Sequence, residues 1–380
     1  MSMKLLPEHE AFRDGVRAFV EREIAPHVSN WDEAETFPRA LYRRAAEVGL
    51  LGIGYPEALG GTPADGWYRL IATEEIARAG SGGLMASLFS HNIGLPPIVA
   101  HGSPALQRRV VPDVLAGEKI AALAITEPSG GSDVARIRTT ARRDGDDWVI
   151  DGEKVFITSG MRADWITLAV RTGSKGAAGI SLIAVPGGAP GLTRSPLAKM
   201  GWWCSDTAQL RFDACRVPAD HLIGEENAGF RAIMENFNGE RLLMSVGACA
   251  FAQACYDEAL GWARQRQTFG APLVSHQAIR HKLMDMQMRI ASTRAWLHAL
   301  VERQEAGDTG AGWVAELCLA KNHATQAMQF CADQAVQILG AMGYMRGTKS
   351  ERIYREVKVM MIGGGAEEIM KELAARQLGV

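Results

Sequence analysis

The sequence lacks the features that mark several large classes of protein. Its formal net charge is −2 over 380 residues, so no excess of basic side chains is present to attract nucleic acid. No stretch approaches the roughly 18 consecutive apolar residues that cross a membrane. The N-terminal MSMKLLPEHEAFRD becomes charged within a few residues, so it is not expected to be a secretory signal. We therefore expect a protein that binds neither nucleic acid nor a membrane.

Cysteine pairs are also missing. The sequence has 6 cysteines, but no two of them form a CxxC pair and none has a histidine at the spacing of a zinc site. We expect reduced, mostly buried thiols in a cytoplasmic protein, and no metal site.

The composition is that of a globular protein, and the pattern of apolar residues divides the chain into three segments. Hydrophobic residues make up 47% and charged residues 22%, and 380 residues are too many for a single core. Apolar residues recur at helical spacing in residues 1–118 and again in 226–380, whereas short apolar runs alternate with turns in 119–225. This segregation predicts an α+β fold with an N-terminal helical domain, a middle small β-barrel or sandwich domain, and a C-terminal helical bundle. No GxGxxG motif follows a strand, which argues against a doubly wound dinucleotide-binding sheet.

Turn residues in the middle segment predict antiparallel strands. Asp144-Gly145-Asp146-Asp147 separates two short apolar runs, and Asp151-Gly152 precedes a third. Asp-Gly between alternating strands is a strong hairpin signal, so both positions are predicted to be turns.

A strand that ends in a polar loop is the first candidate site. Residues 120–132, IAALAITEPSGGS, run from apolar residues into Pro128 and two adjacent glycines, and residues 156–160, FITSG, repeat the pattern. Such loops present backbone N–H groups and hydroxyls to one spot, which suits a phosphate, a carbonyl or a flavin edge. An ordinary strand followed by a surface turn is the alternative. Two such ends on neighbouring strands would form a floor for a planar ligand.

Two further candidates lie in the C-terminal segment. Arg266-Gln267-Thr268-Phe269-Gly270, followed by His276-Gln277, combines a cation and hydroxyl suited to a pyrophosphate with an aromatic ring suited to adenine. A charged helix end with its loop is the bland interpretation. Gln337–Tyr344, QILGAMGY, is a helix end whose small residues permit a close approach of a ligand or a second subunit.

Glu240 is the fourth candidate because it stands inside an apolar helix. It is followed by Arg241 and lies between Phe237 and Leu242. A carboxylate in this setting is either paired with Arg241 or a nearby lysine, or held as a base. Without further context the ion pair is the more frequent arrangement.

Taken together, six motifs resemble the acyl-CoA dehydrogenase family in order and spacing, from about residue 5 to the C-terminus. They are AITEPSGGSD, FITSG, the turn Cys204–Thr207, RQTFG with HQ, QILGAMGY and YREVKVMMIGGG. The resemblance implies helical, β and four-helix-bundle domains in that order, an FAD cofactor and a homotetramer.

The resemblance also implies a place for each site residue. Those that would line the flavin are Leu123, Ile125, Thr126, Ser132, Phe156 and Thr158. Those that would reach the diphosphate and adenine of an FAD bound mainly by a neighbouring subunit are Arg266, Thr268, Phe269, Gln277, Gln337 and Gly340. Ala366 and Glu368 are the remaining cofactor positions, and Ala366 replaces a threonine that many relatives carry. Those that would meet the acyl-CoA substrate are Ser132, Asn238 and Arg241.

One departure from the family pattern concerns the catalytic base. Medium- and short-chain members carry a glutamate in a YEGT turn, where this sequence has Gly364. Long-chain and isovaleryl members lack that glutamate and carry one on a helix, at the position of Glu240. The resemblance therefore implies Glu240 as the base, with the Gly364 N–H still able to hold the thioester oxygen.

The implied reaction is the α,β-dehydrogenation of a saturated acyl-CoA to the trans-2-enoyl-CoA. Glu240 would remove the α-proton, a hydride would pass to flavin N5, and an electron-transferring flavoprotein would take the electrons. Two alternatives remain open. One is an oxygen-using flavin oxidase or monooxygenase on the same scaffold, and the other is a flavoprotein that binds acyl-CoA without catalysis.

Overall fold

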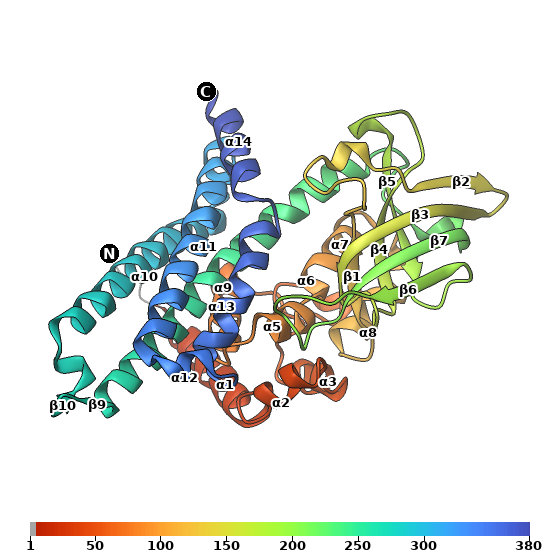
Figure 1. Ribbon diagram of the computed structural model, residues 1–380. Coiled ribbons are helices and arrows are strands. Elements are labelled where there is room, and N and C mark those ends of the chain that lie inside the picture. The colour runs from red at the N-terminus through yellow and green to blue at the C-terminus, as the bar shows by residue number, and fades with distance from the viewer. Residues whose placement is uncertain (1–4) are drawn as a thin grey trace.

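A computed structural model describes residues 5–380 as a group of helices, a β-sheet and a second group of helices (Figure 1). This order confirms the predicted α+β fold class. All 6 cysteines are buried and unpaired, as predicted. Within residues 5–380, no helix is both long and apolar enough to cross a membrane.

The first group consists of short helices. They are α1 (Pro7–Glu23), α2 (Val28–Glu33), α3 (Ala40–Glu47), α4 (Gly66–Ala77), α5 (Gly82–Leu88), α6 (His91–Gly94), α7 (Pro96–His101) and α8 (Pro104–Leu115). Local signals define their ends. Asp65, for example, begins α4 because its side chain accepts a hydrogen bond from the N–H of Trp67.

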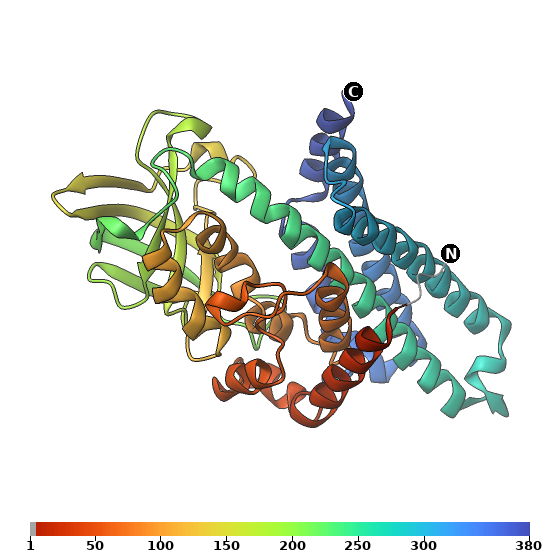
Figure 2. The ribbon, with the colours of Figure 1, turned by 180° about the vertical axis from the view of Figure 1, so that it is seen from behind.

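The middle group is one sheet in the strand order β6-β7-β3-β2-β4-β5-β8, with β1 parallel to β4. The strands are β1 (Ala121–Ala124), β2 (Thr140–Asp144), β3 (Asp147–Thr158), β4 (Trp165–Arg171), β5 (Ile180–Pro186), β6 (Leu192–Pro196), β7 (Thr207–Pro218) and β8 (Leu222–Ile223). The sheet lies at one end of the molecule in both views (Figures 1 and 2).

One of the two predicted hairpin turns is confirmed and the other is wrong. Asp144 pairs with Asp147, so Gly145 and Asp146 form the tight turn between β2 and β3. Asp151-Gly152 instead lies within β3, where the pairing with β7 shifts register. A Cβ on Gly152 would lie 2.7 Å from Thr139, and φ there is +144°. The glycine serves a β-bulge and a close backbone approach, which use the same residue type as a turn.

The last group is a bundle of long helices. Its elements are α9 (Gly229–Gln265), β9 (Gln267–Thr268), β10 (Ala271–Pro272), α10 (Gln277–Glu305), α11 (Ala311–Leu339), α12 (Ala341–Tyr344), α13 (Lys349–Ile362) and α14 (Glu367–Leu378). The helix α9 runs from the sheet into the bundle (Figures 1 and 2). It is buried on both sides, against the first helices and against α11.

The first and last groups share one hydrophobic core although the sheet separates them in sequence. Phe19 of α1, Ile71 of α4, Phe251 of α9 and Met328 of α11 belong to the same buried cluster, and each is at most 1% exposed. The bundle and the N-terminal helices therefore form a single packed body, which holds α9 and its Glu240 rigidly.

Candidate functional site

Glu240 is half-buried on α9 and makes no hydrogen bond or ion pair within residues 5–380. Of the two arrangements left open for Glu240, the ion pair with Arg241 or a lysine is therefore not formed within these residues. The reason is geometric: the Arg241 guanidinium turns away from its neighbour, and its Nε donates to the carbonyl of Gly364 at 2.9 Å. A carboxylate left without a partner is free to accept a proton.

The surroundings of Glu240 also favour proton uptake. Burial raises the pKa of Glu240 to about 7, although the charges of Arg241 and Lys321 act to lower it. A carboxyl group with a pKa near neutrality is suited to general acid–base chemistry at physiological pH.

Arg241 and Asn238 lie together on the same helix. The guanidinium of Arg241 also donates to Asn238 Oδ1 at 3.0 Å and lies over the ring of Phe237. Arg241 is buried, with 6% of its surface exposed. The two predicted substrate-binding residues of α9 are thus held against the glycine turn.

That turn, Gly363–Ala366, joins α13 to α14 and requires glycine. Gly364 has φ +66° and Gly365 has φ +121°, and a Cβ on Gly365 would lie 2.3 Å from Met370 Cε. The Gly364 N–H donates no hydrogen bond within the described part of the chain, residues 5–380. It is therefore available to a ligand oxygen, and the role of Gly364 stays a prediction.

Ala366 and Glu368 follow this turn at the start of α14. Ala366 is the N-cap residue of the helix and supplies no side-chain hydrogen bond, and Glu368 is exposed in the first turn. The missing threonine hydroxyl therefore leaves the first N–H groups of α14 without a cap from that side chain.

The loop after β1 is held by a buried ion pair that the sequence analysis missed. Lys154 Nζ lies 2.9 Å from Glu127 Oε1, and the two side chains are 0% and 4% exposed. The Glu127 carboxylate also accepts from the N–H groups of Arg138 and Thr139, at 2.7 and 2.8 Å. The sequence did offer a signal for this ion pair: Lys154 lies in a strand of alternating residues, and Glu127 follows another predicted strand.

This ion pair fixes the predicted flavin-contact residues of the loop. Lys154 donates to the carbonyl of Ile125, and the carbonyl of Thr126 accepts from the N–H of Val155. Leu123 and Thr126 are half-buried, whereas Ser132 is exposed at the loop tip. Backbone contacts thus bring the end of β1 against the end of β3.

At the end of β3, Phe156 has the geometry of a ligand-contact residue. Its φ is +62°, it lies where the pairing with β7 shifts register, and it is 68% exposed. Thr158, two residues later, is half-buried. A bulky residue with positive φ is strained, and such strain concentrates at functional sites. An exposed aromatic face beside a hydroxyl fits a planar flavin, so the residues present are compatible with this cofactor.

The hairpin β9–β10 carries the other predicted cofactor residues. Phe269 is 100% exposed with φ +50°, and Thr268 Oγ1 lies 3.0 Å from His276 Nε2. Arg266 closes α9, and Gln277 begins α10.

Within a single chain, this hairpin lies far from the ends of β1 and β3, where the flavin ring is predicted to bind. The hairpin lies at the end of the bundle opposite the sheet in both views (Figures 1 and 2). Gln337 and Gly340, at the end of α11, are exposed. Whether these residues serve a neighbouring subunit stays a prediction.

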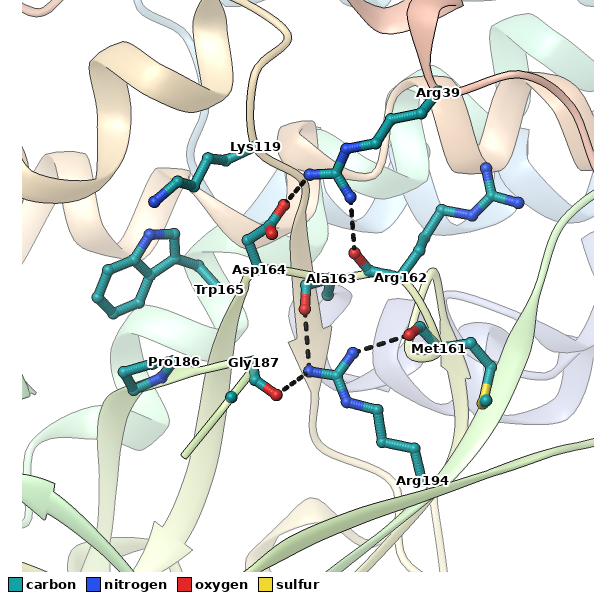
Figure 3. Close-up of a pocket in the computed structure, with 11 residues that line it drawn as sticks. Arg39, Lys119, Met161, Arg162, Ala163, Asp164, Trp165, Pro186, Gly187 and Arg194 are labelled. Atoms are coloured by element: carbon teal, nitrogen blue, oxygen red, sulfur yellow. Dashed lines mark hydrogen bonds and ion pairs between the residues drawn. The ribbon is translucent and has the colours of Figure 1, made fainter. Parts of the chain in front are cut away.

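A separate cleft of about 650 Å³ lies between the first helices and the sheet and contains none of the predicted site residues (Figure 3). Its charged side chains are used within the protein. Arg39 pairs with Asp164, and the guanidinium of Arg194 donates to four backbone carbonyls, including those of Ala163 and Gly187. We interpret this cleft as a junction between domains.

Comparisons with known proteins place these features in a family context. Family models for the acyl-CoA dehydrogenase N-terminal, middle and C-terminal domains match residues 6–118, 122–215 and 227–379. The mitochondrial long-chain specific acyl-CoA dehydrogenase of Sus scrofa is 36% identical over 98% of this chain and 86% of its own length. The mitochondrial isovaleryl-CoA dehydrogenase of Oryza sativa subsp. japonica is 35% identical over 97% and 90%. A crystal structure of a putative acyl-CoA dehydrogenase from Mycobacterium smegmatis is 48% identical, covers 99% of this chain and 98% of its own, and has a TM-score of 0.96.

Proposed function

This chain belongs to the acyl-CoA dehydrogenase family and is an enzyme of acyl-CoA dehydrogenation with a flavin cofactor, and we propose that Glu240 is its general base and FAD its flavin. The observation that carries the proposal is the Glu240 carboxylate, which has no hydrogen-bond or ion-pair partner within residues 5–380. Arg241, the residue next to it, is bonded to the glycine turn, whose Gly364 N–H donates to no group of the same described residues. The base, Glu240 of α9, and the N–H donor, Gly364 of the turn, are thus connected through Arg241.

In the proposed reaction, each of these groups acts on the thioester. The Gly364 N–H donates a hydrogen bond to the thioester carbonyl, which makes the α-proton more acidic. Glu240 accepts that proton. FAD, when bound, would supply the acceptor for the β-hydrogen and its electron pair, so that loss of the α-proton and of a hydride leaves a C=C bond between the α and β carbons. Arg241 and Asn238 hold the acyl-CoA beside the base.

The residues of the sheet would hold the reactive ring of FAD. The exposed ring of Phe156 and the hydroxyls of Thr126, Ser132 and Thr158 would contact it, with Leu123 and Ile125 beneath. Because the Glu127–Lys154 ion pair fixes this loop, the floor is preorganised before the cofactor binds.

Mixing the purified yellow protein with acyl-CoAs under anaerobic conditions tests the proposed function. We expect the visible absorbance of the oxidised flavin to bleach with at least one of butanoyl-, isovaleryl-, octanoyl- and palmitoyl-CoA, because two electrons pass from the substrate to the flavin. Linear and branched chains are both included because relatives named for each are similar to this chain. A protein that keeps its flavin and bleaches with none of them contradicts the proposal.

Admitting air to the bleached protein separates the dehydrogenase from the oxidase alternative. Slow recovery of the yellow colour, which a catalytic amount of an electron-transferring flavoprotein then accelerates, supports the proposed acceptor. If air alone, without the electron-transferring flavoprotein, restores the yellow colour within the time of one turnover, the result supports an oxidase.

We further propose that the hairpin β9–β10 completes the FAD site of a neighbouring copy in a homotetramer. The support is that Phe269 is fully exposed in its own chain and that the hairpin β9–β10 lies at the end of the bundle opposite the sheet (Figure 1). The residues that would join it are Arg266, Thr268, Gln277, Gln337 and Gly340, with Ala366 and Glu368 of α14. The tetramer and a cytoplasmic location stay predictions.

Phe269→Asp is expected to weaken FAD retention by about tenfold or more, because stacking of an aromatic ring on a base contributes about 1–3 kcal/mol. The chain itself should fold normally, since Phe269 packs against little of it. The measurements are the flavin-to-protein absorbance ratio after dialysis and the molecular mass by light scattering. Phe269→Tyr keeps the aromatic face and should retain FAD. Unchanged FAD content in Phe269→Asp contradicts the intersubunit site.

A further inference from the structure

The strongest unexplained feature near the proposed base is a buried lysine on the neighbouring helix. Lys321 of α11 is 0% exposed, although a lysine is almost never fully buried without a partner. Its Nζ donates to two backbone carbonyls, that of Met361 at 3.0 Å and that of Gly365 at 2.8 Å. No carboxylate lies within 4 Å of it in residues 5–380, so its charge is balanced only at longer range.

These two carbonyls place Lys321 on the catalytic turn. Met361 is in the last turn of α13, where carbonyls lack helical partners and carry partial negative charge, and Gly365 follows Gly364 directly. Arg241 of α9 holds the carbonyl of Gly364. Two cations from two packed helices, α9 and α11, therefore bind consecutive carbonyls of the turn and help to fix the backbone that carries the Gly364 N–H.

The same two cations act on Glu240. The charges that lower the pKa of Glu240 are those of Arg241 and Lys321, and the Glu240 charge in turn raises the pKa of Lys321. Burial, together with the charge of Arg241, outweighs that effect and brings the pKa of Lys321 down to about 8. The other groups that face Lys321 are Cys318 on its own helix and Glu367 of α14. Lys321 thus binds the turn through two hydrogen bonds, and its charge lowers the pKa of Glu240.

We infer that Lys321 is a positioning residue of the reaction: its buried ammonium holds the glycine turn against α11 and places a positive charge at the turn that Arg241, the neighbour of Glu240, also binds. This inference rests on the proposed role of Glu240. It assigns to Lys321 two separable effects, the alignment of the Gly364 N–H and the proton affinity of the base.

The pH dependence of flavin bleaching at limiting acyl-CoA distinguishes these effects. In the wild type, the rate should rise with pH through about 7, because Glu240 must lose its proton to act and burial raises its pKa to about 7. Removal of the Lys321 charge withdraws an influence that lowers this pKa. Lys321→Met should therefore move the midpoint upward by about one pH unit and slow the reaction at pH 7 by about fivefold.

Asn322→Leu is the matched control. Asn322 is the next residue of α11, and its Nδ2 donates to the carbonyl of Glu367 at 2.9 Å, so the variant removes a neutral tether from the same region. It should leave the midpoint where the wild type has it, whatever its effect on the rate. An equal displacement in Asn322→Leu overturns the inference, because the shift would then follow from a loosened structure.

Two more variants keep the test decisive if Lys321→Met does not fold. Lys321→Gln can still donate to a carbonyl but carries no charge, so its midpoint should move upward as well. Lys321→Arg keeps the charge and should keep the wild-type midpoint. A wild-type midpoint in Lys321→Gln overturns the inference while the proposed function stands. A wild-type protein that bleaches with no acyl-CoA refutes the proposed function instead.

Discussion

Glu240→Gln is expected to lower the rate of flavin bleaching by acyl-CoA by about 10²–10⁴-fold, the usual contribution of a general base. Glutamine has nearly the same shape and cannot accept the proton. Since Glu240 makes no hydrogen bond or ion pair within residues 5–380, its replacement breaks no contact of the folded chain. The measurement is anaerobic stopped-flow absorbance, and the variant should stay yellow and thermally as stable as the wild type.

Glu235→Gln provides the control for this experiment. Glu235 lies on the same helix, is exposed, and pairs with Arg231 at 2.8 Å on the surface. It should bleach at the wild-type rate. If Glu240→Gln also bleaches at the wild-type rate, the proton acceptor is another group and the proposed mechanism fails.

Glu127→Leu is expected to destabilise the protein by about 3–5 kcal/mol, because it leaves the buried Lys154 ammonium without its partner. It also leaves the N–H groups of Arg138 and Thr139 without an acceptor. Since the loop after β1 carries Thr126 and Ser132, FAD should be lost at a lower temperature or urea concentration than in the wild type. Urea unfolding followed by tryptophan and by flavin fluorescence measures both effects.

A double variant tests the cause of this destabilisation. Glu127→Leu with Lys154→Met removes the uncompensated charge, so it should be more stable than Glu127→Leu alone. The two orphaned N–H groups remain, so recovery should be partial. Wild-type stability of Glu127→Leu, or a double variant less stable than the single one, contradicts the structural role of the ion pair.

Much of the fold was predictable because its signals are local. The long helices α9, α10 and α11 follow from the spacing of their apolar residues, and the β2–β3 turn follows from Gly145. The prediction failed at Gly152, where a bulge within β3 uses the same residue type as a turn. Local composition does not distinguish the two, because the difference is whether the strand continues on the other side.

The candidate site, likewise, has features that local sequence predicts and others that depend on tertiary packing. The sequence indicated that a glutamate stands in the apolar helix α9 and that a glycine turn follows α13. It did not indicate whether Glu240 is paired, because that depends on which carbonyl is nearest to Arg241 after α9 and α13 have packed. Lys321 likewise drew no attention in the sequence, since a single lysine in an apolar helix has no visible partner until the turn is brought to it.

By itself, then, the amino-acid order determined most of the helices and strands, the order of the helical and β segments along the chain, and the identity of the chemical groups. Only the tertiary structure decided which charges neutralise one another and which remain free, and that the first and last segments share a core. The physical reason is range: helix periodicity and turn preferences act over a few residues, whereas the state of Glu240 is set by burial and by two cations, one of them about eighty positions away in the chain.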